Sequence, residues 1–201
     1  MTLFLIVVTG LVSILAFNRP EIYDKFRFNA FLIRHDKAWH RFLTYGLIHA
    51  DWMHLFVNLF VLYSFGEIVE LFYRQMFGLK GSLYYLLLYV GGLAFSTLWD
   101  YGRQKENVYY NAVGASGAVS AIVFASILLY PQGRIFLFFI PIGIPAPIFG
   151  ILYLIYSAVM AARGKGNVGH SAHFWGAVFG LAFTLALNPA TGTHFFHAVF
   201  G

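Results

Sequence analysis

Six apolar stretches divide this chain, and they constrain its fold more than any other feature of the sequence. Hydrophobic residues make up 60% of the 201 positions and charged residues only 10%, whereas a soluble domain carries roughly 25% charge. Each stretch approaches the length of about 20 residues that a helix needs to cross a bilayer. The sequence therefore predicts an all-α membrane protein, a six-helix bundle that forms a single domain over residues 1–201, with membrane helices over residues 2–17, 53–72, 82–98, 116–130, 148–162 and 171–187.

The connection between the first two predicted helices, residues 18–51, is long and mixed in composition. It holds six of the thirteen Lys and Arg residues, yet it is also rich in aromatic and aliphatic side chains. A solvated linker has no use for so many apolar side chains. We expect a folded loop, partly embedded in the membrane, whose short helices lie in the interface and are anchored by Trp39 and Tyr45.

Cysteine content and charge exclude several kinds of site and partner. The chain has no cysteine, so it can form neither a disulfide framework nor a thiolate metal site. The formal net charge of +5 comes from basic residues spread through the loops, so no basic face is predicted and nucleic acid is not an expected partner. The lipid bilayer is the expected partner, and twenty glycines among so many apolar residues indicate closely packed helices.

Ser116 lies between Gly114 and Gly117, where a polar run gives way to the fourth apolar stretch. Because the glycines have no Cβ, another helix or a substrate backbone can come close. The first N–H groups of a helix have no intrahelical partner, so they can bind an oxyanion beside a nucleophile. The same residues also fit a simple small-residue packing patch, and the positions of the histidines are needed to choose between the two interpretations.

The direction of the predicted helices brings several polar residues to one end of the bundle. With six spans, the second, fourth and sixth helices cross in the same direction, and each begins with polar residues, which are His54 with Asn58, Ser116, and His173. Polar groups inside a membrane are costly and usually face an interior cavity. This arrangement suits Ser116 as the nucleophile and His173 as the general base. His54, Asn58 and the Ser116 N–H would then stabilise the oxyanion.

Three short motifs carry a resemblance to a known family. Residues 54–58 read H-x-x-x-N, residues 114–117 read G-x-S-G, and residues 172–180 read A-H-x-x-G-x-x-x-G. Together they resemble the signatures of the rhomboid intramembrane serine proteases. The resemblance implies a rhomboid-like bundle and a Ser116–His173 dyad that works without a carboxylate, metal or cofactor. It also implies a transmembrane protein as substrate, cleaved in or near its membrane segment. Gly176 and Gly180 would let the sixth helix approach the fourth closely.

Two other functions remain open at this point. A proteolytically inactive relative of the rhomboids would keep the fold and bind membrane proteins. A metal-dependent membrane enzyme or transporter would use histidines as ligands, because imidazoles one turn apart on a helix can share a metal; the candidate ligands are His49, His54, His170 and His173. Structural roles nevertheless fit some histidines better than chemistry does, namely His40, His49 and His170.

Two positions depart from the family pattern. Rhomboids often carry a Trp-Arg pair thirteen to fourteen residues before the motif histidine, whereas this chain has His40-Arg41 there, with Trp39 one place earlier. Many also place an aromatic residue one turn after the nucleophile, packed on the catalytic histidine, and here that residue is Ser120. We expect an aromatic side chain from a different helix to lie against the His173 ring, because a void beside it would be costly.

The resemblance further implies a multi-pass protein of the bacterial inner membrane whose site opens to the outside. On that orientation the outer loops hold ten Lys and Arg residues and the inner loops three, which is the reverse of the positive-inside rule. Without the folded first loop the count is four against three. The proline-rich residues 141–147, the fifth helix and residues 163–167 are candidates for a lateral gate and cap.

Overall fold

The computed structural model describes residues 1–137, 142–163 and 169–201 of the chain. Within these residues the six predicted stretches are long helices that begin within two residues of the predicted positions. They are α1 (Thr2–Asn18), α5 (Trp52–Phe77), α6 (Lys80–Gln104), α7 (Ser116–Leu129), α8 (Ala146–Arg163) and α9 (His170–Leu187). Helices α5 and α6 continue beyond their predicted ends because they extend through arginine and glutamine residues, which favour helix although they are not apolar.

Four of the helices in the described residues are long and apolar enough to cross a membrane, namely α5, α6, α8 and α9. The remaining two are shorter, with 17 residues in α1 and 14 in α7. A helix of 14 residues is about 21 Å long, whereas the hydrocarbon core is about 30 Å thick. A mostly helical, multi-pass membrane fold is therefore confirmed, and full crossing by α1 and α7 stays a prediction.

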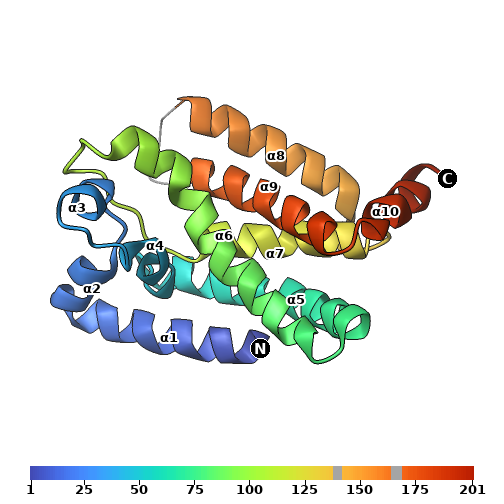
Figure 1. Cartoon of the computed structure of the whole chain (residues 1–201), viewed down its shortest axis with the longest axis horizontal. Helices are drawn as coiled ribbons and strands as arrows, with labels where there is room; N and C mark the ends of the chain where they lie inside the picture. Colours follow the sequence, from blue (N-terminus) through green and yellow to red (C-terminus); the bar gives the residue numbers. More distant parts are fainter. Residues whose placement is uncertain (138–141, 164–168) are drawn as a thin grey trace.

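Helix α7 forms the centre of the bundle. It packs against α5, α6 and α9, while α1 packs on α5 and α8 packs on α9. Figure 1 shows α1 and α8 at opposite edges of the bundle, with α7 between them. Every residue of α7 after Ser116 is buried, so protein rather than lipid surrounds this helix and its length does not have to match the bilayer.

Two glycines of α9 allow it to lie directly on the backbone of α7. A Cβ added at Gly176 would overlap the carbonyl oxygen of Gly117, and a Cβ added at Gly180 would overlap the carbonyl oxygen of Ala121. The obstacles are backbone atoms, which cannot rotate away as a side chain can. The two helices therefore touch backbone to backbone along two successive turns, as small residues at i and i+4 permit in membrane proteins.

The first loop is folded, as expected, and consists of short helices. These are α2 (Pro20–Phe26), α3 (Ala30–His35), α4 (Arg41–Thr44) and the 3-10 turn η1 (Tyr45–Leu47). Arg41 holds the loop together, because its buried guanidinium donates to the carbonyl oxygens of Asp24 at 2.8 Å and Arg27 at 2.7 Å. Trp39, in contrast, is 58% exposed, so its role as an interfacial anchor, like the partial embedding of the loop, stays a prediction. Tyr45 is 2% exposed and its hydroxyl donates to the Leu93 carbonyl, so the prediction that Tyr45 is an interfacial anchor is wrong.

Two small elements depart from the expected all-α chain. Strand β1 (Arg134–Ile135) pairs antiparallel with β2 (Ile144–Pro145), because the prolines after residue 140 favour extended backbone over helix. Residues after Pro189 form the helix α10 (Ala190–Phe200), in which His194 and His197 are exposed. Parts of the candidate gate and cap, residues 141 and 164–167, lie outside the described residues.

Candidate active site

The segment that leads into Ser116 is held by the first loop. Phe28 and Ala112 exchange two backbone hydrogen bonds, of 2.9 and 3.1 Å, and so form an isolated antiparallel bridge. The Gly114 N–H then donates to the carbonyl oxygen of Tyr45 at 2.9 Å. These contacts join residues that are more than 65 positions apart, so the loop and the start of α7 form one structural unit around the candidate nucleophile Ser116.

His49 adds a third attachment and is completely buried. Its Nε2 accepts a hydrogen bond from the Ala115 N–H at 3.3 Å, so the proton of the neutral ring must lie on Nδ1. Nδ1 faces the Ser13 hydroxyl at 3.0 Å, and that hydroxyl donates to the Leu47 carbonyl at 2.8 Å. Burial lowers the pKa of His49 to about 3, which keeps the ring neutral. These contacts are those of a structural residue that ties α1 to the start of α7.

Gly114 has a backbone conformation and a neighbour that only glycine tolerates. Its φ of 111° lies in the region that other residues avoid. A Cβ at this position would lie 2.5 Å from Cε1 and 2.7 Å from Nε2 of His54. The His54 ring therefore lies directly on the backbone two residues before Ser116. On its other side the ring accepts the Ala50 N–H through Nδ1 at 3.5 Å, which favours the tautomer with the proton on Nε2, beside the site.

Asn58 follows His54 by one turn and is 5% exposed. Its amide nitrogen donates one hydrogen bond to the His54 carbonyl at 2.9 Å. The amide nitrogen carries a second N–H that can serve a ligand. Asp51 fixes the start of α5 because its carboxylate accepts the His54 N–H at 2.8 Å as an N-cap. The beginning of α5 thus has a defined place beside the start of α7.

His173 lies in the first turn of α9, where its N–H donates to the Gly169 carbonyl at 3.0 Å. The carbonyl of its neighbour Ala172 would lie 3.4 Å from a Cβ at Gly117, so the residues next to the two candidate dyad members face each other. Among the hydrogen bonds of the described residues, none joins Ser116 to His173. Catalytic hydrogen bonds are often long in structures without substrate and tighten when substrate binds.

An aromatic ring from another helix lies near His173, on the helix pair where the serine at position 120 leaves room. It belongs to Tyr153 of α8, whose ring is nearly parallel to the imidazole, with centroids 6.2 Å apart and planes inclined by 26°. Direct contact between the two rings, within about 4.5 Å, stays a prediction. His170 also lies near the His173 imidazole, with ring centroids 6.1 Å apart and planes at 81°. The sequence indicated that a ring was needed and did not identify which one.

The histidines do not form a recognisable metal centre in the part of the chain that the structure describes. No three His, Cys, Asp or Glu side chains gather there in a way that could hold a metal ion. The closest pairs are His49 with His54, whose ring centroids are 4.9 Å apart, and His170 with His173. In the first pair, both nitrogens of His49 already have hydrogen-bond partners.

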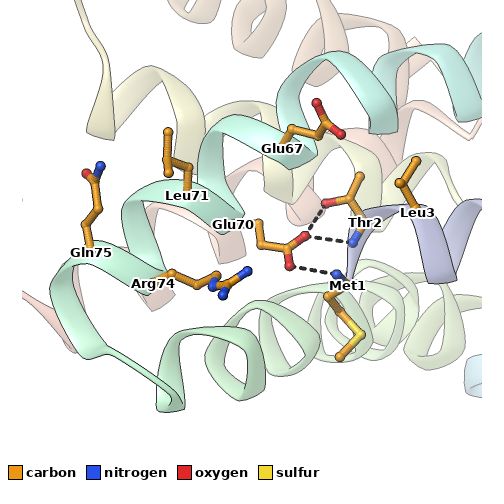
Figure 2. Close-up of a pocket in the computed structure, with 8 residues that line it drawn as sticks. All are labelled: Met1, Thr2, Leu3, Glu67, Glu70, Leu71, Arg74 and Gln75. Carbon is orange, nitrogen blue, oxygen red and sulfur yellow. Dashed lines mark hydrogen bonds and ion pairs between the residues drawn. The ribbon is translucent and has the colours of Figure 1, made fainter.

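A surface pocket of about 570 Å³ lies at the other end of the bundle and is unrelated to this constellation. Figure 2 shows Glu70 of α5 at its centre, bonded to the first residues of α1. The Glu70 carboxylate accepts the Thr2 N–H at 2.8 Å and the Thr2 hydroxyl at 2.9 Å. The carboxylate thus satisfies orphan donors at the N-terminus of α1 and interacts favourably with the helix dipole. These contacts are structural, since they join α1 to α5.

Comparison with known proteins now places the chain in a family. A family model described as the Rhomboid domain matches residues 36–190. The chain belongs to the rhomboid family. It is 31% identical over 167 residues to RHOMBOID-like protein 12, mitochondrial, of Arabidopsis thaliana, an alignment that covers 77% of this chain and 49% of that protein. It is also 39% identical over 99 residues to Rhomboid-like protein 11, chloroplastic, of the same plant, covering 49% of this chain and 32% of that protein.

A third rhomboid relative, Rhomboid protein 1, mitochondrial, of Saccharomyces cerevisiae, is 25% identical over 146 residues, covering 71% of this chain and 40% of that protein. The chain thus spans about half the length, or less, of the curated relatives it matches. The names of these relatives place them in mitochondria and chloroplasts. The comparisons confirm the family and give no support to the bacterial inner membrane as the location of this chain.

Proposed function

We propose that this chain is an intramembrane serine endopeptidase that cleaves peptide bonds in or near the membrane segments of other proteins. The observation that carries the proposal is the meeting of three helix starts, at which the His54 ring covers Gly114 and the α9 backbone touches Gly117 at Ala172, the residue before His173. Ser116 stands at the centre of this meeting point, on the first turn of α7. Such a constellation combines a nucleophile, a base and hydrogen-bond donors.

In the proposed reaction, Ser116 Oγ attacks the scissile carbonyl carbon while neutral His173 takes the hydroxyl proton. The tetrahedral oxyanion accepts hydrogen bonds from the Ser116 N–H, the His54 Nε2–H and the Asn58 amide. His173 then gives its proton to the leaving amine, the C–N bond breaks, and an acyl-enzyme remains. Water, deprotonated by His173, attacks the ester and releases the carboxylate product and the free serine.

The substrate is a transmembrane protein whose helix opens locally. A hydrogen-bonded helix hides its carbonyls from attack, and a lipid-exposed backbone cannot leave its hydrogen bonds unmade. Segments with small or helix-breaking residues near the scissile bond therefore suit this site. This proposal includes a six-span topology, in which α1 and α7 also cross the membrane. It also includes a site that opens on the same side of the membrane as the first loop.

A proteolytically inactive, membrane-protein-binding rhomboid is the second candidate. The absence of a Ser116–His173 hydrogen bond among the described residues favours it, since an inactive relative needs no aligned base. The two candidates differ in whether Ser116 reacts. A purified protein that binds membrane segments, leaves them intact and does not react with a fluorophosphonate would be the inactive form.

The decisive experiment incubates the purified chain with a transmembrane substrate in liposomes, beside the variants Ser116→Ala and His173→Ala. We expect cleavage by the wild type alone, with similar losses in each variant and in the double variant because the two residues act as a unit. A metal-dependent reaction would instead survive Ser116→Ala and stop with EDTA. Turnover by the Ser116→Ala protein would refute the proposed function.

A further inference from the structure

Ser120 and Tyr153 form a contact that the proposed reaction does not use. Their hydroxyl oxygens lie 2.8 Å apart and share a hydrogen bond. Ser120 stands one turn after Ser116 on α7 and is 4% exposed, whereas Tyr153 lies midway along α8. The small serine leaves room on the face of α7 that looks toward α8, and the phenol of the neighbouring helix reaches into that room.

The Tyr153 ring is restrained on several sides. Phe124 of α7 and Phe149 of α8 lie with their ring centroids 5.6 and 5.7 Å from it, within the range of favourable aromatic pairs. The hydroxyl is tied to Ser120, and the ring lies nearly parallel to His173. A ring fixed at its edge and at its polar tip limits the orientations that the adjacent imidazole can adopt.

The helix that carries this ring is the most exposed of the spanning helices. In α8, 17% of the residues in its 18-residue apolar stretch are buried in the bundle. The corresponding share is 28% in α5, 33% in α9 and 44% in α6. Figure 1 shows α8 at the edge of the bundle, beside α9. The support for His173 therefore comes from a helix with few buried residues, and not from the central helix that carries Ser116.

We propose that Tyr153 is the positioning residue of His173, and that its hydrogen bond to Ser120 makes the alignment of the base depend on how α8 packs against α7. The kinetic part of this inference rests on the proposed endopeptidase function. With α8 packed, the phenol excludes imidazole rotamers that turn away from Ser116. With α8 displaced, the ring leaves and the base loses its orientation, so cleavage is coupled to the position of α8.

The kinetic test separates the ring from its hydrogen bond. Tyr153→Phe and Ser120→Ala each remove the hydrogen bond alone, so we expect each to lower kcat about 3–10-fold. The double variant should lose no more kcat than the single variant with the larger loss, because both changes break the same hydrogen bond. Tyr153→Ala should lose about 30–100-fold in kcat with KM within about two-fold, since a misplaced reacting group affects chemistry more than binding. Ile155→Ala, on the exposed side of the same helix, is the matched control and should keep wild-type kinetics.

Exchanging the ring between helices tests the geometry. Ser120→Phe alone should lower activity, because the new ring would overlap Tyr153. Combined with Tyr153→Ala it should restore kcat to within about five-fold of the wild type, because the ring then reaches His173 from α7. A merely structural role for Tyr153 would not produce such rescue, so failure of the pair to recover above Tyr153→Ala would overturn the proposal.

A measurement independent of proteolysis separates this inference from the proposed function. Diethylpyrocarbonate acylates accessible neutral imidazoles, and peptide mass spectrometry reports each histidine separately. Tyr153→Ala should raise the modification rate of His173 several-fold, while His197, which is exposed on α10, stays unchanged as an internal control. If the wild type cleaves no substrate and Tyr153→Ala still raises the modification rate of His173, the positioning role stands and the endopeptidase function falls. If His173 reacts equally in both proteins, the positioning role falls, whatever the protease assay gives.

Discussion

Replacing Gly176 by alanine tests whether α7 and α9 touch backbone to backbone. The new Cβ would overlap the Gly117 carbonyl oxygen and would lie 2.8 Å from the Gly117 carbonyl carbon. Ordinary contacts between carbon atoms are about 3.5–4.0 Å, so the two backbones must separate by roughly 1 Å. Gly176 follows His173 by one turn and Gly117 follows Ser116 directly, so this displacement falls on the candidate dyad.

The expected size of the effect follows from two opposing contributions. Alanine favours a helix over glycine by about 0.5–1 kcal/mol, whereas overpacking costs about 1–3 kcal/mol, so the net loss in the free energy of unfolding lies between about 0 and 2.5 kcal/mol. A misplacement of about 1 Å in the dyad costs about 10²-fold in kcat. Gly180→Ala should lose similar stability and less activity, because Gly180 lies about 10 Å from His173 along α9 and Gly176 only about 5 Å.

Gly10 of α1 provides the matched control, since it is also a glycine inside a helix. A Cβ at Gly10 would meet only Leu59 Cδ1 at 3.6 Å, an ordinary contact. Gly10→Ala should therefore be neutral or stabilising by up to about 1 kcal/mol and should keep wild-type activity. Thermal unfolding in detergent and cleavage of a transmembrane substrate would be measured for all three variants. Wild-type stability and kcat in Gly176→Ala would refute the close approach of α7 and α9.

Three further predictions concern the surroundings of Ser116. Asn58→Ala should lower kcat by about 10–10³-fold with little change in Tm, and full activity would remove α5 from the site. The free energy of unfolding should fall as pH falls from 7 to 5, because the His49 pKa of about 3 in the folded protein lies below its ordinary value of 6.5 and protonation favours the unfolded chain. That contribution is about 2 kcal/mol, so a flatter pH profile is expected for His49→Gln, and an identical profile would contradict the burial argument. Tyr45→Phe removes hydrogen bonds to the Leu93 carbonyl and the Ser96 hydroxyl, so Tm should fall by an amount equivalent to about 1–3 kcal/mol, which circular dichroism in detergent would measure.

The helices were predictable because the length of each apolar run approaches what is needed to cross a bilayer. The face that each helix buries was not predictable in the same way. In α1 the buried residues are mostly small and polar, and they recur every three or four positions: Thr2, Leu5, Thr9, Ser13 and Ala16. The larger apolar residues of the same helix point outward, with Leu3, Phe4 and Leu11 each more than half exposed. In lipid the hydrophobic effect does not select the inner face, so small and polar residues mark it instead. The hydroxyl stripe of α1 was the available signal, and it was missed.

The candidate site was predictable where the motif residues stand at helix starts, because parallel helices bring their first turns together. Two side chains that support the candidate site lie outside the three motifs. Ser13 supports His49 from a helix with no motif, and Tyr153 comes from α8, for which sequence spacing gives no direction. Phe149 and Tyr153 stand at i and i+4 and share a helix face, so an aromatic face of α8 was visible. Its orientation toward His173 depends on how α8 packs, which cannot be read from residue spacing.

The first loop is part of the candidate site, because it holds the backbone that leads into Ser116. The segment before Ser116 has no regular structure to hold it, and Gly114 adopts a backbone conformation that does not persist unless its surroundings impose it. Phe28, Tyr45 and His49 supply those surroundings through hydrogen bonds to the backbone of residues 112–115. A change in the loop can therefore misplace Ser116 while every membrane helix stays intact. If the proposed function holds, a loop variant can lose activity because Ser116 is misplaced, and a measurement of stability alone would not reveal the cause.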